Sequence, residues 1–130
     1  MKRLAIDVQP GEYTVARLEP DAPVPAALLE RPGFVSVTRT LAELSVICAS
    51  GDEPEGARVE AGWRLLTVRG PLAFQLTGII AALANELAAA GVALFTLSTF
   101  DTDHVLVKRA DLERAVNALR GAGHEVALPG

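Results

Sequence analysis

From residue 63 onward, the hydrophobic positions change from a strand pattern to a helix pattern. Residues 63–69 (WRLLTVR) predict a short strand that ends at Gly70 and Pro71, because proline lacks an amide donor and glycine permits a turn. A helix follows, and Gly91 is placed to end it in a left-handed cap. The apolar positions of this helix recur at steps of three and four and form one buried face: Leu76, Ile79, Ile80, Leu83 and Leu87.

The rest of this half predicts two strands, a helix and a last strand. Residues 92–99 are typical of a buried strand, and residues 104–108 are its antiparallel neighbour across an acidic turn. Asp111 is placed to cap a second helix, Gly121 to stop it, and residues 124–128 to close the sheet. The order βαββαβ predicts an α+β, ferredoxin-like unit, with a four-stranded antiparallel sheet and two helices on one face.

The first half repeats this pattern in reduced form. Residues 13–18 predict a strand, residues 24–30 a shortened helix, and residues 34–40 and 44–50 a strand pair. Aligning Thr40 with Thr99 places residues 46–48 opposite residues 105–107. We therefore expect two tandem units with sheets packed side by side, residues 1–60 and 61–130, joined by a glycine-rich and acidic connection over residues 51–62.

Charge and composition exclude several classes of partner. Twelve Lys and Arg against sixteen Asp and Glu give a net charge of -4, which does not favour binding to nucleic acid or to an anionic membrane. Because no apolar run is long enough to span a bilayer and the N-terminus lacks a signal peptide, we expect a cytoplasmic protein. The lone Cys48 forms no disulfide, and no second histidine lies near His104, so we expect no metal and no cofactor.

The sequence also lacks the common signatures of catalysis. No Gly-x-Ser-x-Gly elbow is present to expose a nucleophilic serine. Residues 70–78 (GPLAFQLTG) lack the Gly-Lys-Ser/Thr ending of a phosphate loop. We therefore expect a protein that is not an enzyme.

Three stretches carry a resemblance to a known family: FVSVTRTLAELSVIC, GWRLLTVRGPLAFQLTGIIAALANELAAAGV and LFTLSTFDTDHVLVK. They resemble the small bacterial tandem ACT-domain proteins related to the CASTOR-type arginine sensors of animal cells, over about residues 12 to 120. ACT domains are regulatory modules that bind a free amino acid, usually where two of them pack together. The resemblance implies an amino-acid sensor without catalytic residues, in which Ser45 and Val46 of the first unit line the interface through backbone groups.

The residues themselves fit a zwitterionic ligand. Uncapped amides at a helix start, around Thr77, Gly78 and Ile79, carry partial positive charge and suit a carboxylate. Asp101 or Asp103, at the end of the neighbouring strand, would then meet the ammonium group. We therefore predict that one amino acid is held at the interface of the two units, with its carboxylate near Gly78, its ammonium near Asp103, and Ser45 and Val46 facing it from the first unit.

The side chain of the ligand and the output of binding are less defined. Phe74 and Leu76, near the expected pocket, favour an apolar or aromatic side chain. The helix between residues 74 and 90 has Glu86 as its one charged residue, which favours a homodimer or larger assembly that covers its alanine-rich face. The signal itself would pass to a further, unidentified protein or to a change of assembly.

Simpler explanations exist for the same residues. Gly78 also suits close helix packing, and Asp101 and Asp103 are also typical turn formers. The alternative function is therefore a structural dimerisation or protein-interaction module that has lost ligand binding. The joint presence of Gly78 and Asp103 favours the ligand site, because a packing module needs neither.

Overall fold

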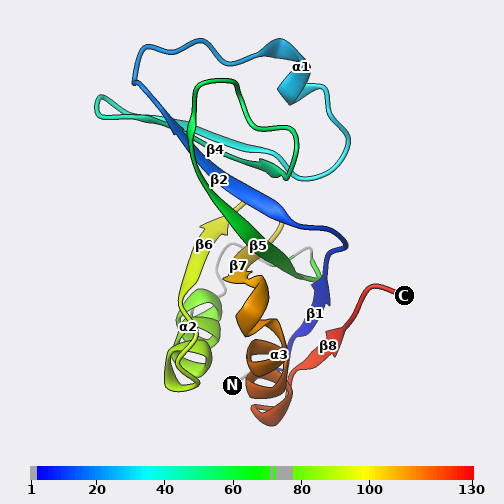
Figure 1. Ribbon diagram of the computed structural model, residues 1–130. Helices are drawn as coiled ribbons and strands as arrows, with labels where there is room; N and C mark the ends of the chain where they lie inside the picture. The colour runs from blue at the N-terminus through cyan, green and yellow to red at the C-terminus, as the bar shows by residue number, and fades with distance from the viewer. Residues whose placement is uncertain (1–2, 71, 73–77) are drawn as a thin grey trace. The chain divides into compact units, whose positions relative to one another are not determined.

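A computed structural model of the chain describes residues 3–70, 72 and 78–130. It divides into two compact units, one formed by residues 1–10 with 64–130 and the other by residues 11–63. The elements in chain order are β1 (Ala5–Val8), β2 (Tyr13–Leu18), α1 (Ala26–Leu29), β3 (Ser36–Arg39), β4 (Leu44–Ala49), β5 (Arg58–Val68), α2 (Ile79–Ala89), β6 (Leu94–Ser98), β7 (Asp103–Lys108), the 3₁₀ turn η1 (Arg109–Asp111), α3 (Leu112–Gly121) and β8 (Glu125–Ala127) (Figure 1).

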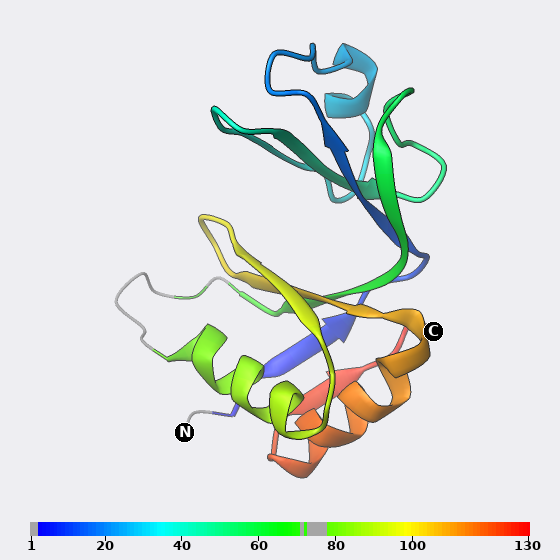
Figure 2. The ribbon, with the colours of Figure 1, turned by 60° about the vertical axis from the view of Figure 1, so that its left-hand side comes forward.

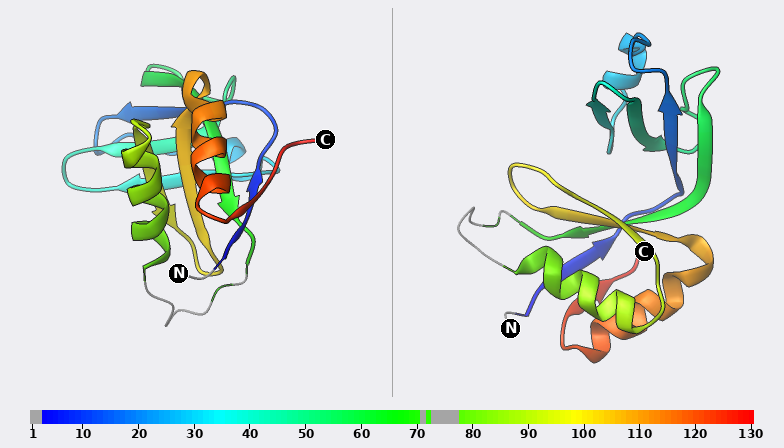
Figure 3. Two further views of the ribbon diagram at one scale, coloured as in Figure 1. Left: turned by 90° about the horizontal axis from the view of Figure 1, so that it is seen from below. Right: turned by 90° about the vertical axis from the view of Figure 1, so that its left-hand side faces the viewer.

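The unit containing residues 64–130 is a sheet with two helices on one face. Its strand order is β8-β1-β5-β7-β6, and α2 and α3 cover the same side of this sheet (Figures 2 and 3). The predicted α+β class is confirmed. The sheet differs from the prediction in two respects. It has a fifth strand, β1, which the sequence analysis does not predict, and β8 closes the sheet beside β1 and parallel to it, with Val126 opposite Ile6. On its other side β1 pairs antiparallel with β5, where Ile6 lies opposite Val68.

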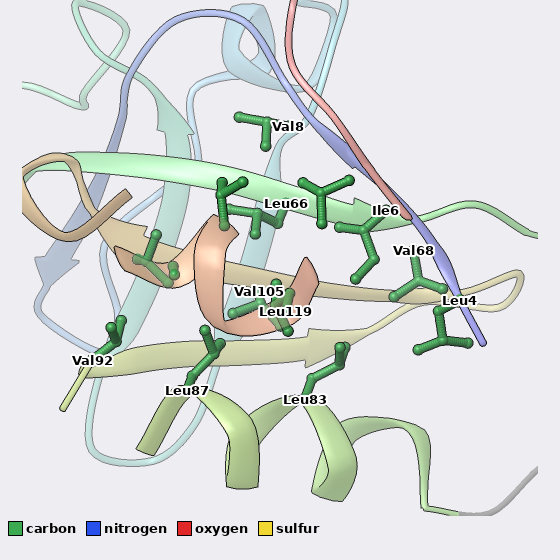
Figure 4. Close-up of a cluster of buried hydrophobic side chains, with 14 of the residues drawn as sticks. Leu4, Ile6, Val8, Leu66, Val68, Leu83, Leu87, Val92, Val105 and Leu119 are labelled. Atoms are coloured by element: carbon green, nitrogen blue, oxygen red, sulfur yellow. The ribbon is translucent and has the colours of Figure 1, made fainter. Parts of the chain in front are cut away.

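The apolar core of this unit lies between the sheet and the two helices. Its side chains come from every layer, as Figure 4 shows. Burying one leucine or valine stabilises a fold by about 1.5 to 3 kcal/mol, so these contacts dominate the stability of the unit. The buried members are Leu4, Ile6, Val8, Leu66, Val68, Ile79, Leu83, Leu87, Val92, Val105, Val107, Ala115, Val116, Leu119 and Val126.

The predicted cap at the end of α2 is confirmed. Gly91 has a φ of 76° and donates its amide to the Ala88 carbonyl at 3.0 Å. The Val92 amide reaches back to the Leu87 carbonyl at 2.9 Å. These two bonds satisfy carbonyls that the helix end would otherwise leave open.

The two predicted ends of α3 are confirmed in position but not in mechanism. Gly121 is its last residue, but it is Gly123, with a φ of 95°, that makes the left-handed turn after the helix. Asp111 lies at the N-cap position, but its side chain does not bond a helix amide. Instead it accepts a 2.7 Å bond from Arg114. Asp111 ends the 3₁₀ turn η1 with a φ of -100° and a ψ of 0°, which is not the extended backbone from which an N-cap side chain reaches the helix amides.

The unit of residues 11–63 has the strand order β3-β4-β2-β5 and one helix of four residues, α1. Its core is correspondingly small: Ala16, Leu28, Leu44, Val46 and Cys48. The predicted connection over residues 51–62 is wrong in its second half, because β5 already begins at Arg58. The predicted division at residue 60 differs from the two units in that residues 1–10 pack with the C-terminal half.

No helix in the described part of the chain is both long and apolar enough to cross a bilayer.

Candidate functional site

The start of α2 leaves backbone amides without a partner inside the helix. Gly78 is the N-cap, with a φ of 79°, and its carbonyl accepts the first intrahelical bond from the Ala82 amide at 2.9 Å. The amides of Ile79, Ile80 and Ala81 therefore have no acceptor within the helix, and they carry the positive end of its dipole.

Gly78 is required by its backbone conformation. A Cβ built at this position would meet no atom of the described residues within 4 Å, so packing against them does not explain the glycine. The positive φ does, because L residues adopt the left-handed region only with strain. The backbone conformation thus accounts for the glycine without the packing alternative.

Asp103 belongs to a strand. It is the first residue of β7, lies opposite Ser98 of β6 and is half-buried. The Ser98 hydroxyl donates to Asp103 Oδ1 at 2.6 Å, which holds the carboxylate in one orientation. Asp103 is therefore not a turn former. Asp101 does lie in the turn, where its side chain is exposed.

The turn of residues 99–102 is fixed against the end of β5. The Leu72 amide donates to the Asp101 carbonyl at 2.6 Å, and the Thr102 hydroxyl donates to the Val68 carbonyl at 2.5 Å. A Cβ on Gly70 would lie 2.9 Å from the Asp101 carbonyl oxygen, closer than real Cβ contacts come. Gly70 therefore permits this close approach, a role that its place after a strand does not reveal.

These elements enclose one pocket of about 330 Å³. This volume is at the lower end of the range for small-molecule sites. Four of the eight residues predicted as ligand contacts line it: Gly78, Ile79, Asp101 and Asp103. The full lining within the described residues is Leu72, Gly78, Ile79, Ile80, Ala81, Ser98, Thr99, Phe100, Asp101, Thr102 and Asp103.

The other four predicted contacts stay predictions. Leu76 and Thr77 lie outside the described residues, as does Phe74. Ser45 and Val46 lie on β4 of the 11–63 unit, where Ser45 is half-buried opposite Arg17 and Val46 is fully buried in the small core.

The sequence reasoning missed three hydroxyl residues of the pocket wall: Ser98, Thr99 and Thr102. The sequence analysis predicts an acidic turn between the two strands and assigns a role to Asp101 and Asp103 alone. A dense run of hydroxyl and acidic residues at the end of an apolar strand was the available signal.

The described lining of the pocket is electrostatically one-sided. Its charged side chains are Asp101 and Asp103, and it includes no Lys or Arg. Its positive potential comes from the amides at the start of α2. Such a site suits a molecule that carries both a carboxylate and a positive group. No group of three or more potential metal-ligating side chains occurs within the described residues.

His104 contacts the pocket wall through Thr99 and is buried. Its exposed fraction is 8%. Burial lowers the pKa of its imidazole, and the neighbouring Asp103 raises that pKa to a smaller extent. The ring contacts two threonine hydroxyls, with Nδ1 3.0 Å from Thr67 Oγ1 and Nε2 3.2 Å from Thr99 Oγ1. His104 thus connects β5 to the first residue of the turn.

Family models match the two halves of the chain separately. The ACT domain model matches residues 58–121, and a model of an N-terminal domain matches residues 11–55. The human cytosolic arginine sensor for mTORC1 subunit 1 is 37% identical over 59 residues, which is 45% of this chain and 18% of the human protein. The matched stretch is therefore a small part of that relative's length.

Solved structures resemble the chain over its whole length. A crystal structure of an Agobacterium tumefaciens protein has a TM-score of 0.91 and 38% identity, covering 100% of this chain and 96% of its own. The regulatory subunit of aspartate kinase from Thermus thermophilus has a TM-score of 0.67 at 14% identity, covering 94% and 99%. The second likeness shows a shared fold alone.

Proposed function

Because this chain belongs to the ACT-domain family, we propose that it is a regulatory module that binds a free amino acid in the pocket at the start of α2 and catalyses no reaction itself. A relative named as an arginine sensor supports a sensing role. The observation that carries the proposal is that one pocket brings the start of α2 together with Asp103.

The two ends of an amino acid fit the two sides of this pocket. The ligand carboxylate accepts hydrogen bonds from amides at the start of α2, where the helix dipole favours a negative charge. The ligand ammonium donates to Asp103, whose carboxylate the Ser98 hydroxyl already orients. A charged hydrogen bond of this kind contributes about 1.5 to 3 kcal/mol.

A second carboxylate favours a ligand with a basic side chain. After Asp103 pairs with the ammonium group, Asp101 remains as a further anion on the lining of the pocket. A cationic side chain such as that of arginine or lysine neutralises it. This argument replaces the sequence-based preference for an apolar side chain, which depended on Phe74 and Leu76.

The direct test is a thermal-shift screen of the protein against the twenty amino acids, with L-arginine and L-lysine expected to give the largest shifts. A ligand at 100 times its dissociation constant adds about 2.7 kcal/mol of stability. If none of the twenty raises the melting temperature, the protein is instead a structural or protein-interaction module without a ligand.

Asp103→Asn tests the assignment of the ammonium. The variant keeps the shape of the side chain and should reduce affinity about 10- to 100-fold, as expected for the loss of one charged hydrogen bond. Asp21→Asn is the matched control, since Asp21 is an exposed acid of the other unit. Equal affinity of Asp103→Asn and wild type would refute the assignment.

The proposed module also forms a homodimer through α2. Ala81, Ala88 and Ala89 expose an uncharged helix surface, which a second copy would cover. Sedimentation should show a dimer at micromolar concentration, and a monomer would rule out this assembly. The signal would then pass through a change of assembly or a further protein.

A further inference from the structure

His104 and Thr99 form a connected set of hydrogen bonds with a defined direction. The Thr99 hydroxyl donates to the Thr102 carbonyl at 3.2 Å, so in its contact with His104 it is the acceptor. His104 Nε2 therefore carries the hydrogen and donates to Thr99. The Nδ1 atom in turn accepts from the Thr67 hydroxyl. The neutral tautomer with its hydrogen on Nε2 is therefore consistent with all three hydrogen bonds, Thr99 to Thr102, His104 to Thr99 and Thr67 to His104.

The equivalent turn of the other unit closes in a different way. There the Thr40 hydroxyl accepts from the amides of Ala42 and Glu43, at 3.1 and 3.2 Å. The threonine thus caps the amides of its own turn, as hydroxyl residues in turns commonly do. The position that corresponds to His104 in that unit is Ser45, and it makes no contact of this kind with Thr40 among the hydrogen bonds of the described residues.

The turn of residues 99–102 leaves the corresponding amides open. The amides of Asp101 and Thr102 correspond to those of Ala42 and Glu43, and within the described part of the chain they donate to no atom. Both residues line the pocket. The difference between the two turns is the imidazole, which engages the hydroxyl that would otherwise cap these amides.

We propose that His104 is a positioning residue of the pocket: by holding the Thr99 hydroxyl, it keeps the amides of Asp101 and Thr102 open as donors to the ligand carboxylate, in addition to the amides at the start of α2. The part of this inference that concerns the ligand rests on the proposed function. The part that concerns His104 rests on the hydrogen bonds alone. Burial, which lowers the pKa of His104, supports it by keeping the ring in the neutral form.

Amide hydrogen exchange of the unliganded protein tests the role of His104. In His104→Leu the Thr99 hydroxyl is released and bonds the turn amides, so exchange at Asp101 and Thr102 should slow about fivefold, the equivalent of one ordinary hydrogen bond. Simple destabilisation would accelerate exchange. Unchanged or faster exchange at both amides therefore overturns the proposal.

Three further variants make the result specific. His104→Gln keeps a donor near Nε2 and should restore fast exchange at the two amides. The double variant Thr99→Val with His104→Leu removes the hydroxyl and should abolish the slowing. His124→Leu removes the other buried histidine, whose Nδ1 accepts from the Leu4 amide at 3.1 Å, and should leave these two amides unchanged. Slowing in this control, or its persistence in the double variant, contradicts the mechanism.

Exchange in the presence of L-arginine tests the second half of the inference. If L-arginine raises the melting temperature, it should slow exchange at Asp101 and Thr102 in the wild type. Binding that leaves both amides unprotected overturns their role as ligand donors. If no amino acid binds, the proposed function fails, and exchange in the unliganded variants still decides whether His104 keeps the amides open.

Discussion

The β6–β7 hairpin and the β3–β4 hairpin, one in each unit, share a register but differ in what they offer a ligand. In the first the Thr99 amide donates to the Thr102 carbonyl at 2.8 Å, and in the second the Thr40 amide donates to the Glu43 carbonyl at 2.9 Å. The predicted alignment of Thr40 with Thr99 is therefore confirmed at the level of backbone hydrogen bonds.

The two hairpins differ in the residue that follows the turn. Asp103 starts β7 and lines the pocket, whereas Leu44, at the corresponding position, is fully buried in the small core. The helices differ as well, with eleven residues in α2 and four in α1. A helix of four residues has too few turns to build a dipole of comparable strength. Both units thus have the strand hairpin, but the acid and the long helix that form the pocket occur in the unit of residues 64–130.

Placing an aspartate at Leu44, the position in the smaller unit that corresponds to Asp103, should have the largest effect on stability. Leu44→Asp places a carboxylate among apolar side chains without a partner, which should cost about 3 to 5 kcal/mol. Urea denaturation measures the loss. Leu44→Met, which conserves volume, is the control and should cost less than about 1.5 kcal/mol. A carboxylate tolerated at this position would show that the small core is not closed to water.

Gly70→Ala should break the contact between β5 and the turn of residues 99–102. The added Cβ lies 2.9 Å from a backbone oxygen that cannot give way alone, so the turn must shift at a cost of about 1 to 3 kcal/mol. Chemical shifts of the turn amides and urea denaturation report the change.

Gly121→Ala is the matched control for this glycine. Gly121 is the last residue of α3, where a Cβ would meet no atom of the described residues within 4 Å, and alanine favours the helix by up to about 1 kcal/mol. Equal effects of the two substitutions would mean that the close approach at Gly70 is not what fixes the turn.

Lowering the pH should destabilise the larger unit, because His104 becomes protonated. The folded pKa of this ring is lowered from 6.5, so the unfolded chain takes up a proton first as the pH falls. The stability contributed by the neutral ring is complete above pH 6.5 and is lost as the pH falls through the folded value, at about 1.4 kcal/mol for each unit of lowering. Urea titrations between pH 7.5 and 5 should show this slope, and His104→Gln should reduce it. An equal slope in both proteins would assign the effect to other groups.

Cys48 and Val107 are equivalent core positions, so exchanging one for the other should matter least. Cys48→Val should change stability by less than about 1.5 kcal/mol. Burial and nearby acids raise the pKa of the Cys48 thiol to about 11, so at neutral pH its thiolate fraction is roughly 100-fold below that of a free thiol. Alkylation of the folded protein should be correspondingly slow, and rapid labelling would show that the small core opens readily.

Local sequence patterns were sufficient for the strands and helices of residues 63–127. The apolar spacing of α2 and the glycine after it predicted a helix and its cap, because both depend on neighbours within one or two turns. The same holds for Gly78 and the acids of the turn, whose residue types indicated a polar pocket before any contact was known.

The errors concern which residues contact each other, both far apart in the chain and close together. The position of β1 between β5 and β8 depends on pairing across more than half of the chain. The side chain of Asp111 was expected to cap a helix and instead pairs with Arg114, a choice between two nearby partners that residue type does not decide.

By itself, the sequence of this protein determined its α+β elements other than β1, the internal repeat and the polar residues that follow the strand of the second repeat. Only the tertiary structure decided which residues meet: that Gly70 admits the turn of residues 99–102, and that a buried His104 holds the hydroxyl of Thr99. The physical reason is that periodicity encodes which face of an element is apolar, whereas the partner of a polar group depends on where the folded chain brings it.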